Sequence, residues 1–305
     1  MIMLQQMIVL FLIMLVGFWS RKKGILDDNA SKKISGIVIN IANPALILSA
    51  SLSKDSTIEG SDLVMTFMIA IVLFASLVLL AHFLPMILRV PKRDYGIYKA
   101  MIVFSNIGFM GFPVISAVYG SEALLYASLF LIPFNILIYT YGIQVMRPAT
   151  AEKEPFQLKK VLNIGVIACI LSLVIYLFKI PTPKAIDSTI TLLSNLTAPL
   201  SMMVIGDSMT KMNLKELVTD TKLIIFSMIK LVLIPLAGVA AIKLLGVNPM
   251  LTGVCMIMLS TPVGSMTAML AQQYDGDFEL ASRGVALTTL LSVLSMPLIS
   301  AITGV

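Results

Sequence analysis

Long apolar segments follow one another along almost the whole chain, and they limit what this sequence can fold into. A helix needs about 20 mostly apolar residues to cross a bilayer. Ten segments meet this requirement: residues 2–20, 33–52, 63–88, 98–119, 123–146, 161–179, 186–210, 222–245, 249–272 and 282–303. Hydrophobic residues make up 58% of the chain and charged residues only 12%. Because a soluble core cannot bury so much apolar surface, the sequence predicts that lipid surrounds the chain.

The backbone of each apolar segment must satisfy its hydrogen bonds without water, and this favours helices. Membrane-spanning strands would appear as alternating segments of about ten residues, which the sequence lacks. The first segment follows Met1 directly and is itself followed by RKKG, the reverse of a cleavable signal peptide. We therefore expect an all-α integral membrane protein with ten transmembrane helices, folded as one unit over residues 1–305.

Lys and Arg residues are divided unevenly between the two sets of connections. Of the 22 in the chain, 17 lie on one side: Arg21, Lys22, Lys23, Lys32, Lys33, Arg89, Lys92, Arg93, Lys99, Arg147, Lys153, Lys159, Lys160, Lys211, Lys215, Lys222 and Arg283. The other side holds Lys54, Lys179, Lys184 and Lys243. By the positive-inside rule the richer side faces the cytoplasm. This predicts a multi-pass protein of the plasma membrane with both termini extracytoplasmic.

Prolines occupy matching places in the two halves of the chain. Pro44 and Pro199 lie in the middle of the second and seventh segments, and Pro113 and Pro262 lie in the fourth and ninth. A single proline in a membrane helix is usually only a kink. Interrupted segments at corresponding places of two inverted halves instead indicate the binding site of a secondary transporter. The predicted inverted repeats cover residues 1–146 and 161–305.

Glycine accompanies these prolines in the fourth and ninth segments, where SNIGFMGFPV (105–114) and STPVGSM (260–266) lie in the middle of apolar sequence. Gly and Pro allow a helix to unwind, and the unwound backbone must then line a cavity or face protein. Two half-helices that begin at such breaks would aim their positive ends at a small anion, particularly a carboxylate. The expected site residues there are Asn106, Gly108, Gly111, Pro113, Ser260, Thr261, Pro262, Gly264 and Ser265.

Polar residues elsewhere in the apolar segments are weaker candidates. Asn43 beside Pro44 and Ser201 beyond Pro199 could contact the substrate or only stabilise helix packing. Lys230 is an ion inside a membrane segment, which indicates either a functional site or a side chain that snorkels to the interface. We expect Asp207 and Lys230 to form an ion pair that opens during gating or coupling.

Catalytic and metal-binding patterns are not found in the sequence. His82 is the single histidine, and the two cysteines, Cys169 and Cys255, lie within apolar segments. Neither pattern suits a metal site or a disulfide framework. HExxH, a nucleophile elbow and a phosphate-binding loop are all absent. We expect no enzyme activity, no catalytic residue, no cofactor and no nucleic-acid partner.

Four stretches resemble the auxin efflux carrier family in its shorter prokaryotic form. They are NIANPAL (40–46), SNIGFMGFPVISAVYG (105–120), NLTAPLSMMVIGDSM (195–209) and STPVGSMTAMLAQQYDGDFELASRGVALTTLLSVLSMPL (260–298). Together with the ten segments, the resemblance covers essentially the whole chain. The long central cytoplasmic loop of the plant relatives is missing from this sequence, so regulation through that loop does not carry over.

The resemblance implies a five-plus-five inverted repeat whose fourth and ninth helices cross at their breaks. It implies a scaffold at 1–52 and 161–210 and a mobile transport unit at 63–146 and 222–305. It further implies a homodimer that exports or exchanges small organic anions by alternating access, such as the indole-3-acetate of plant relatives or malate-like acids. The family's substrate-holding Asn in the first broken helix corresponds to Asn106.

Two other functions fit the same pattern of segments. One is a sodium- or proton-coupled symporter or antiporter of the same crossed-helix architecture, with Gln272, Gln273 and the backbone carbonyls near the breaks as candidate cation ligands. It is disfavoured because no carboxylate lies beside either break in the sequence. The other is a membrane sensor that uses a carrier-like body, which the absence of a soluble domain argues against.

Overall fold

The computed structural model describes residues 2–52, 58–146, 161–210, 219–274 and 276–305. The polar connection at 147–160 and Asp275 therefore lie outside the described residues. Regular structure in the described part is helical throughout, apart from one isolated bridge between Ser105 and Val263. The prediction of an all-helical fold is confirmed.

Seven helical stretches are long and apolar enough to cross a membrane: Met3–Lys22, Asp28–Leu52, Gly60–Ile87, Ala123–Met146, Lys184–Met209, Thr221–Leu244 and Phe278–Thr303. Three shorter apolar helices, Ile107–Tyr119, Ile164–Leu177 and Pro249–Ser260, lie in the fourth, sixth and ninth predicted segments. The fold is that of a multi-pass integral membrane protein. The count of ten spanning helices stays a prediction.

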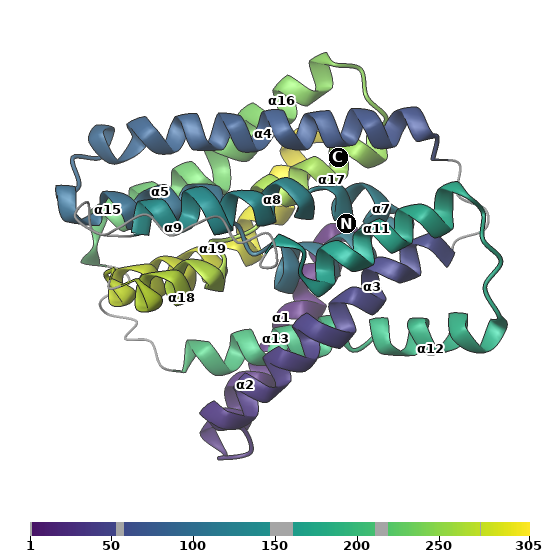
Figure 1. Ribbon diagram of the computed structural model, residues 1–305. Helices are drawn as coiled ribbons and strands as arrows, with labels where there is room; N and C mark the ends of the chain where they lie inside the picture. Colours follow the sequence, from purple (N-terminus) through teal and green to yellow (C-terminus); the bar gives the residue numbers. More distant parts are fainter. Residues whose placement is uncertain (1, 53–57, 147–160, 211–218, 275) are drawn as a thin grey trace.

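The first half of the chain begins with a long helix and ends with a series of short ones (Figure 1). The elements are α1 (Ile2–Lys22), α2 (Asp28–Ile37), η1 (Val38–Ala42), α3 (Asn43–Ser49), η2 (Ala50–Leu52), α4 (Gly60–Ile87), η3 (Lys92–Asp94), α5 (Tyr95–Val103), η4 (Ile107–Gly111), α6 (Phe112–Tyr119), α7 (Ala123–Leu129), α8 (Leu131–Leu137), η5 (Ile138–Gly142) and α9 (Ile143–Met146).

The second half again alternates long and short helices. Its elements are α11 (Ile164–Leu177), α12 (Lys184–Ser194), α13 (Thr197–Met209), α15 (Thr221–Met228), η6 (Ile229–Leu233), α16 (Ile234–Leu244), α17 (Pro249–Ser260), α18 (Ser265–Gln273) and α19 (Phe278–Thr303). Several helices begin at side chains that accept a hydrogen bond from their first turn, as Asn163, Asn248 and Asp277 do. Such caps satisfy amide groups that have no acceptor within the helix.

Three prolines follow wide π-helical turns inside longer helices. The turns η1, η4 and η6 are each followed by a helix with proline as its second residue: Pro44, Pro113 and Pro235. Proline has no amide hydrogen and crowds the preceding turn, so a locally widened turn lets the helix continue. Pro199 lies in the middle of the helical stretch Lys184–Met209, as expected. It occupies the first turn of α13, just after the turn at 195–196, where proline is well tolerated.

Glycine allows the helices of the first and seventh segments to pack closely. A Cβ atom on Gly17 would lie 2.2 Å from the Met203 carbonyl oxygen, and one on Gly206 would lie 1.9 Å from that of Met14. Helix α13 thus packs directly on α1, and it also contacts α2 and η4. Small residues at a helix contact are typical of membrane proteins, because they let two backbones approach.

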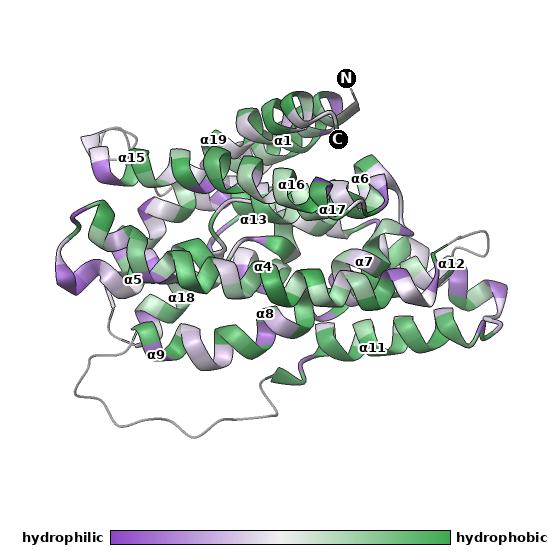
Figure 2. Cartoon of the chain, turned by 90° about the horizontal axis from the view of Figure 1, so that it is seen from above, coloured by the Kyte–Doolittle hydropathy of each residue, from purple (hydrophilic) through white to green (hydrophobic). Residues whose placement is uncertain are grey.

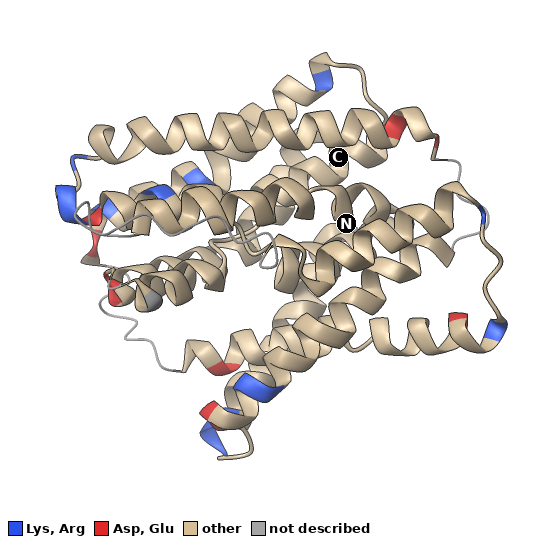
Figure 3. Ribbon diagram, viewed as in Figure 1, with Lys and Arg blue, Asp and Glu red and all other residues tan. Residues whose placement is uncertain are grey.

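The surface of the molecule is suited to lipid. Large apolar side chains are exposed along the outer helices, among them Val64 and Leu79 on α4 and Leu12 on α1. Figure 2 shows hydrophobic residues along the length of the helices, with hydrophilic residues gathered mostly towards their ends. Figure 3 shows Lys, Arg, Asp and Glu concentrated at the ends of the helical bundle. This distribution leaves the middle of the molecule almost without charge.

Candidate functional site

Helices are broken in both segments that the Gly and Pro pattern indicates, although in the fourth the break precedes Gly108, Gly111 and Pro113, which are helical. In the fourth segment α5 ends at Val103, and the residues 104–106 that follow are not helical. In the ninth segment α17 ends at Ser260, and Thr261 and Gly264 have extended backbone before α18 begins at Ser265. Each break thus separates two half-helices.

The two breaks lie side by side and are hydrogen-bonded to each other. Ser105 and Val263 form an antiparallel bridge, the Asn106 amide donates to the Pro262 carbonyl at 2.8 Å, and the Gly264 amide donates to the Phe104 carbonyl at 2.8 Å. The unwound backbone groups therefore satisfy each other, as they must where water is excluded. We call this pair of breaks, residues 104–106 and 261–264, the crossing.

Gly264 is required for this close approach. A Cβ atom there would lie 3.0 Å from the Ser105 carbonyl oxygen and 3.1 Å from that of Phe104. Gly111 plays a similar part, because its Cβ atom would lie 3.3 Å from the Cγ2 methyl group of Thr261. Two of the predicted glycines thus hold the two broken segments in contact.

Four helix ends meet at the crossing. The stretch η4–α6 and helix α18 begin there, while α5 and α17 end there. The first amide groups of a helix and its last carbonyl groups have no partner within the helix. The crossing therefore offers amide donors from two ends and carbonyl acceptors from the other two.

Polar side chains of neighbouring helices approach the first break. The Asn43 side chain on α3 lies beside Gly108, since a Cβ atom on that glycine would be 3.3 Å from Asn43 Nδ2. Asn43 Oδ1, Thr197 Oγ1 and Ser201 Oγ are all buried and have no hydrogen-bond partner. Buried polar atoms without partners are uncommon in native proteins and often indicate a missing ligand or water. Pro44 is itself buried beside Asn43.

Asn106 also has hydrogen-bonding capacity to spare. Its backbone amide is used in the crossing, and its carbonyl oxygen accepts from the Met110 and Gly111 amides at 3.1 Å each. The side chain is buried, with 5% of the residue exposed, and it caps no helix. Its amide group is thus free to bind a ligand at the end of the first half-helix.

The hydroxyl groups predicted at the second break are mostly used within the protein. Ser260 Oγ donates to Met256 Sδ at 3.6 Å, and Thr261 Oγ1 donates to the Met258 carbonyl at 2.8 Å. Both residues are fully buried, whereas Ser265 is exposed at the start of α18. Of the predicted residues at the second break, Pro262 and Gly264 shape the backbone and Ser265 can meet a ligand.

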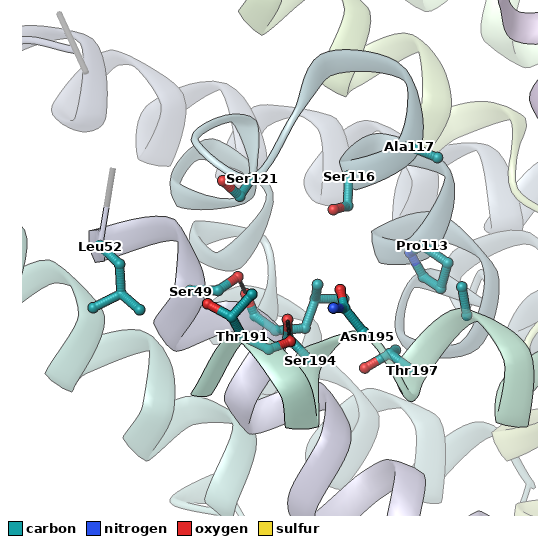
Figure 4. Close-up of a pocket in the computed structure, with 12 residues that line it drawn as sticks. Ser49, Leu52, Pro113, Ser116, Ala117, Ser121, Thr191, Ser194, Asn195 and Thr197 are labelled. Carbon is teal, nitrogen blue, oxygen red and sulfur yellow. Dashed lines mark hydrogen bonds between the residues drawn. The ribbon is translucent and has the colours of Figure 1, made fainter. Parts of the chain in front are cut away.

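A cavity of about 440 Å³ lies between α3, α6 and the pair α12–α13 (Figure 4). Of the predicted site residues, Pro113 is the one that lines it. Its other lining residues are Leu46, Ser49, Leu52, Ser116, Ala117, Ser121, Thr191, Ser194, Asn195, Thr197 and Ala198. The described lining is rich in hydroxyl groups and carries no charge. Two of its lining residues lie one helical turn from the candidate residues Ser201 and Asn43: Thr197 on α13 and Leu46 on α3.

None of these polar lining residues was predicted as a site residue. On α12 and α13, Thr191, Ser194 and Thr197 recur every third residue, which is the spacing that places side chains on one face of a helix. Ser49 Oγ donates to the Leu46 carbonyl and Ser194 Oγ to the Thr191 carbonyl. The recurring polar positions were a detectable signal, although membrane helices also use such residues for packing.

The expected ion pair between Asp207 and Lys230 is not formed in this structure. Asp207 is buried where α13 meets α1 and α2; it accepts a hydrogen bond from Ser31 Oγ at 2.7 Å and lies 3.6 Å from Arg21 Nε. Lys230 Nζ instead donates to the Ile102 carbonyl at 3.0 Å and to Ser105 Oγ at 2.6 Å. The Asp207 carboxylate thus lies beside Arg21, while the Lys230 side chain extends to the first break. Their roles in gating or coupling stay predictions.

Metal ligands do not cluster in the described part of the chain, where no three His, Cys, Asp or Glu side chains could hold one ion. Cys169 and Cys255 are both buried and reduced. Asp94, outside the predicted segments, is mostly buried beside Arg93, with Arg93 Nε 3.4 Å from Asp94 Oδ1. Burial raises the pKa of Asp94, Arg93 opposes this, and the charges of Asp277 and Asp220 add to the increase.

Comparison with known proteins adds a family to this geometry. Residues 2–300 match the family model described as "Membrane transport protein". The chain is 25% identical over 292 residues to an uncharacterized transporter of Methanothermobacter thermautotrophicus, with 95% of each chain covered. It is 26% identical over 309 residues to an uncharacterized transporter of Methanocaldococcus jannaschii, with 98% of each covered.

Proposed function

The chain belongs to the membrane transport protein family, which is the auxin efflux carrier family that its motifs resemble, and on that premise we propose that it moves small organic anions across the plasma membrane by alternating access. We expect the protein to export carboxylates or to exchange one carboxylate for another. That the protein is a membrane transporter follows from the family; the substrate class and the mechanism are the proposal.

The proposed architecture has ten spanning helices in a five-plus-five inverted repeat, residues 1–146 and 161–305. The three shorter apolar helices complete the ten, because the fourth and ninth segments are divided by breaks and cross as pairs of half-helices. Residues 1–52 and 161–210 form the scaffold, and residues 63–146 and 222–305 form the transport unit. The working form is a homodimer with both termini extracytoplasmic.

One observation carries the proposal: two broken helices are joined at the crossing, beside buried polar atoms that have no partner. The amide ends of η4–α6 and α18 suit a carboxylate. Asn106, together with Asn43 and Ser201 on the facing helices, can add hydrogen bonds to it. Broken helices whose ends face a substrate near mid-membrane are the usual binding sites of secondary transporters.

The cavity beside the crossing is the outward route to this site. Lys184 and the connection after Leu52 lie on the side that the positive-inside rule assigns to the exterior, and the cavity is lined by residues close to both. Its volume of about 440 Å³ lies within the usual range of about 300–1,000 Å³ for small-molecule sites. When the transport unit moves against the scaffold, α6 leaves α12–α13 and the site faces the cytoplasm.

A sodium- or proton-coupled symporter or antiporter is the second candidate. It is favoured by the carbonyl ends of α5 and α17, which also meet at the crossing and could coordinate a cation. This candidate is weaker because a cation site usually needs a carboxylate. In the described part of the chain, no carboxylate of an ion pair lies at the crossing, and no cluster of acidic, His or Cys side chains could hold a metal ion.

Uptake into proteoliposomes tests the proposal. The purified protein is reconstituted and a panel of labelled monocarboxylic and dicarboxylic acids is offered, with sodium, proton and voltage gradients imposed one at a time. We expect saturable uptake of at least one acid, which protein-free liposomes do not show. Uptake of sodium or another cation without any organic anion would overturn the proposal in favour of the second candidate.

A further inference from the structure

Lys230 is fully buried in η6 and reaches the crossing from the side of the transport unit. Its exposed fraction is 0%, so it does not snorkel to the membrane surface. The Nζ atom donates to the carbonyl of Ile102, in the last turn of α5, and to the hydroxyl of Ser105, which is bridged to Val263. One cationic side chain thus touches the backbone of the first break and the residue that joins it to the second.

No acidic partner of Lys230 occurs among the residues that the structure describes. The recorded ion pairs are Arg21 with Asp28, Arg21 with Asp207, and Arg93 with Asp94. Lys230 is itself fully buried, with two neutral oxygen atoms as its recorded hydrogen-bond partners. A buried cation is poorly solvated, and a nearby anion stabilises it strongly.

The amide ends at the crossing can bind a carboxylate locally, but the four helix ends together discriminate only weakly between an anion and a cation. Two amide ends contribute about half a positive charge each, and two carbonyl ends contribute about half a negative charge each. With all four ends at the crossing, these contributions largely cancel. The ammonium group of Lys230 is the full charge that remains. It therefore decides which sign of ligand the crossing favours.

We propose that Lys230 sets the anion selectivity of the crossing and that the substrate carboxylate is its missing counter-charge. This inference rests on the proposed transport of organic anions. Lys230 acts through Ser105 and through its electric field, so it is a positioning residue and does not itself touch the substrate. Hydrogen bonds from Asn106, Asn43 and Ser201 then orient the carboxylate that Lys230 attracts.

The position of Lys230 in the transport unit has a consequence for voltage. When the unit moves with one monocarboxylate bound, the charges of Lys230 and of the substrate cross the membrane together and cancel. The loaded step is then insensitive to membrane potential. Without the ammonium group the same step carries one negative charge, and a potential across the membrane changes its rate.

Four variants separate charge from structure at this point. K230M keeps most of the length of the side chain without its charge, and K230R keeps a charge that cannot be lost by deprotonation. S105D places a carboxylate beside Lys230 Nζ. S105N is the control for S105D, because Asn has nearly the same shape as Asp but no charge. K222M is the control, because Lys222 Nζ also donates to a backbone carbonyl, that of Arg89, but is exposed at the helix end.

The measurement compares binding of a transported monocarboxylic acid with that of its uncharged primary amide. The wild type, K230R, S105N and K222M should prefer the acid, and K230M and S105D should lose about tenfold or more of that preference. This is the size expected for one unit charge at roughly 10 Å with an effective dielectric constant of about 20. In exchange of labelled external acid for the same acid inside, which uses only the loaded step, the rate should be independent of an imposed potential in the wild type and become dependent on it in K230M.

Two results would overturn the inference. One is an unchanged preference for the acid in both K230M and S105D; the other is an acid-for-acid exchange rate in K230M that stays independent of voltage. If K230M does not fold, S105D against S105N still decides, because that pair retains Lys230. A wild type that binds no carboxylic acid would instead refute the proposed function, so the two failures are distinguishable.

Discussion

Single polar side chains beside the crossing have hydrogen-bonding capacity that the protein itself does not use. Asn43, Thr197 and Ser201 have buried polar atoms without partners. The side chain of Asn106 is buried as well and caps no helix. Keeping such atoms buried without a partner costs about 1–3 kcal/mol each. A ligand or water that binds them recovers this free energy, which is why we place the substrate here.

Replacing Asn106 with Ala should weaken substrate binding while the protein still folds. A hydrogen bond to a charged group contributes about 1.5–3 kcal/mol, so the dissociation constant for a transported acid should rise about tenfold to a hundredfold. Equilibrium binding in detergent measures it. Asn40→Ala is the control, because the exposed Asn40 side chain only donates to the Gly36 carbonyl of its own helix. Equal affinity in the wild type and Asn106→Ala would place the site elsewhere.

Asp94 should make the folded state less stable as the pH rises. Burial raises its pKa above the ordinary 3.8, so the folded state binds more protons than the unfolded state in the interval above that value. Stability then falls as the pH rises through that interval. Asp94→Asn removes this contribution. Thermal unfolding in detergent, followed between about pH 4 and 7, should show the variant gaining relative to the wild type with rising pH; a constant difference would contradict this.

Some helix ends and breaks are determined by residues that act on the adjacent backbone, and such features can be predicted from the sequence. Gly264 and Pro262 interrupt the ninth segment at the predicted place, because their backbone properties are independent of the rest of the fold. Helix ends capped by Asn or Asp likewise follow from the adjacent sequence. In the fourth segment the break at 104–106 instead precedes Gly108, Gly111 and Pro113, which lie in the helical η4 and α6. The place of this break depends on the bridge from Ser105 to Val263, a residue far along the chain.

Replacing Gly206 with Ala should disturb the packing of helix α13 on α1 and lower the stability of the protein. The added Cβ atom would lie 1.9 Å from the Met14 carbonyl oxygen, and overpacking of this kind costs about 1–3 kcal/mol. Gly36→Ala is the matched control, because nothing lies within 4 Å of its Cβ position and Ala is the better helix former. Thermal unfolding in detergent should show a lower midpoint for Gly206→Ala only. Equal midpoints would contradict the close contact.

Across the whole molecule, contacts between distant segments could not be read from the sequence. The ion-pair partner of Asp207 is Arg21, from the other half of the chain, whereas the sequence predicted Lys230. The cavity is likewise formed by three separate segments. Its Ser and Thr residues resemble those that pack membrane helices. Periodicity gives the face on which a residue lies but not the element that it meets.

The orientation in the membrane follows from charge and can be checked in cells. Lys184 and Lys92 are both exposed and belong to connections on opposite sides of the predicted membrane. A membrane-impermeant maleimide should label Lys184→Cys in intact cells and Lys92→Cys only after permeabilisation. The native Cys169 and Cys255 are buried and should react little. Labelling of Lys92→Cys in intact cells would reverse the assigned orientation.

The central claim is that an organic anion binds where the two broken helices are joined. An experimental structure of the protein with a brominated carboxylic acid that it transports tests this most directly, because bromine can be located by its anomalous scattering. We predict that the carboxylate lies between the crossing and the side chains of Asn43, Asn106 and Ser201. A fully bound acid whose bromine and carboxylate lie away from the crossing would contradict the claim.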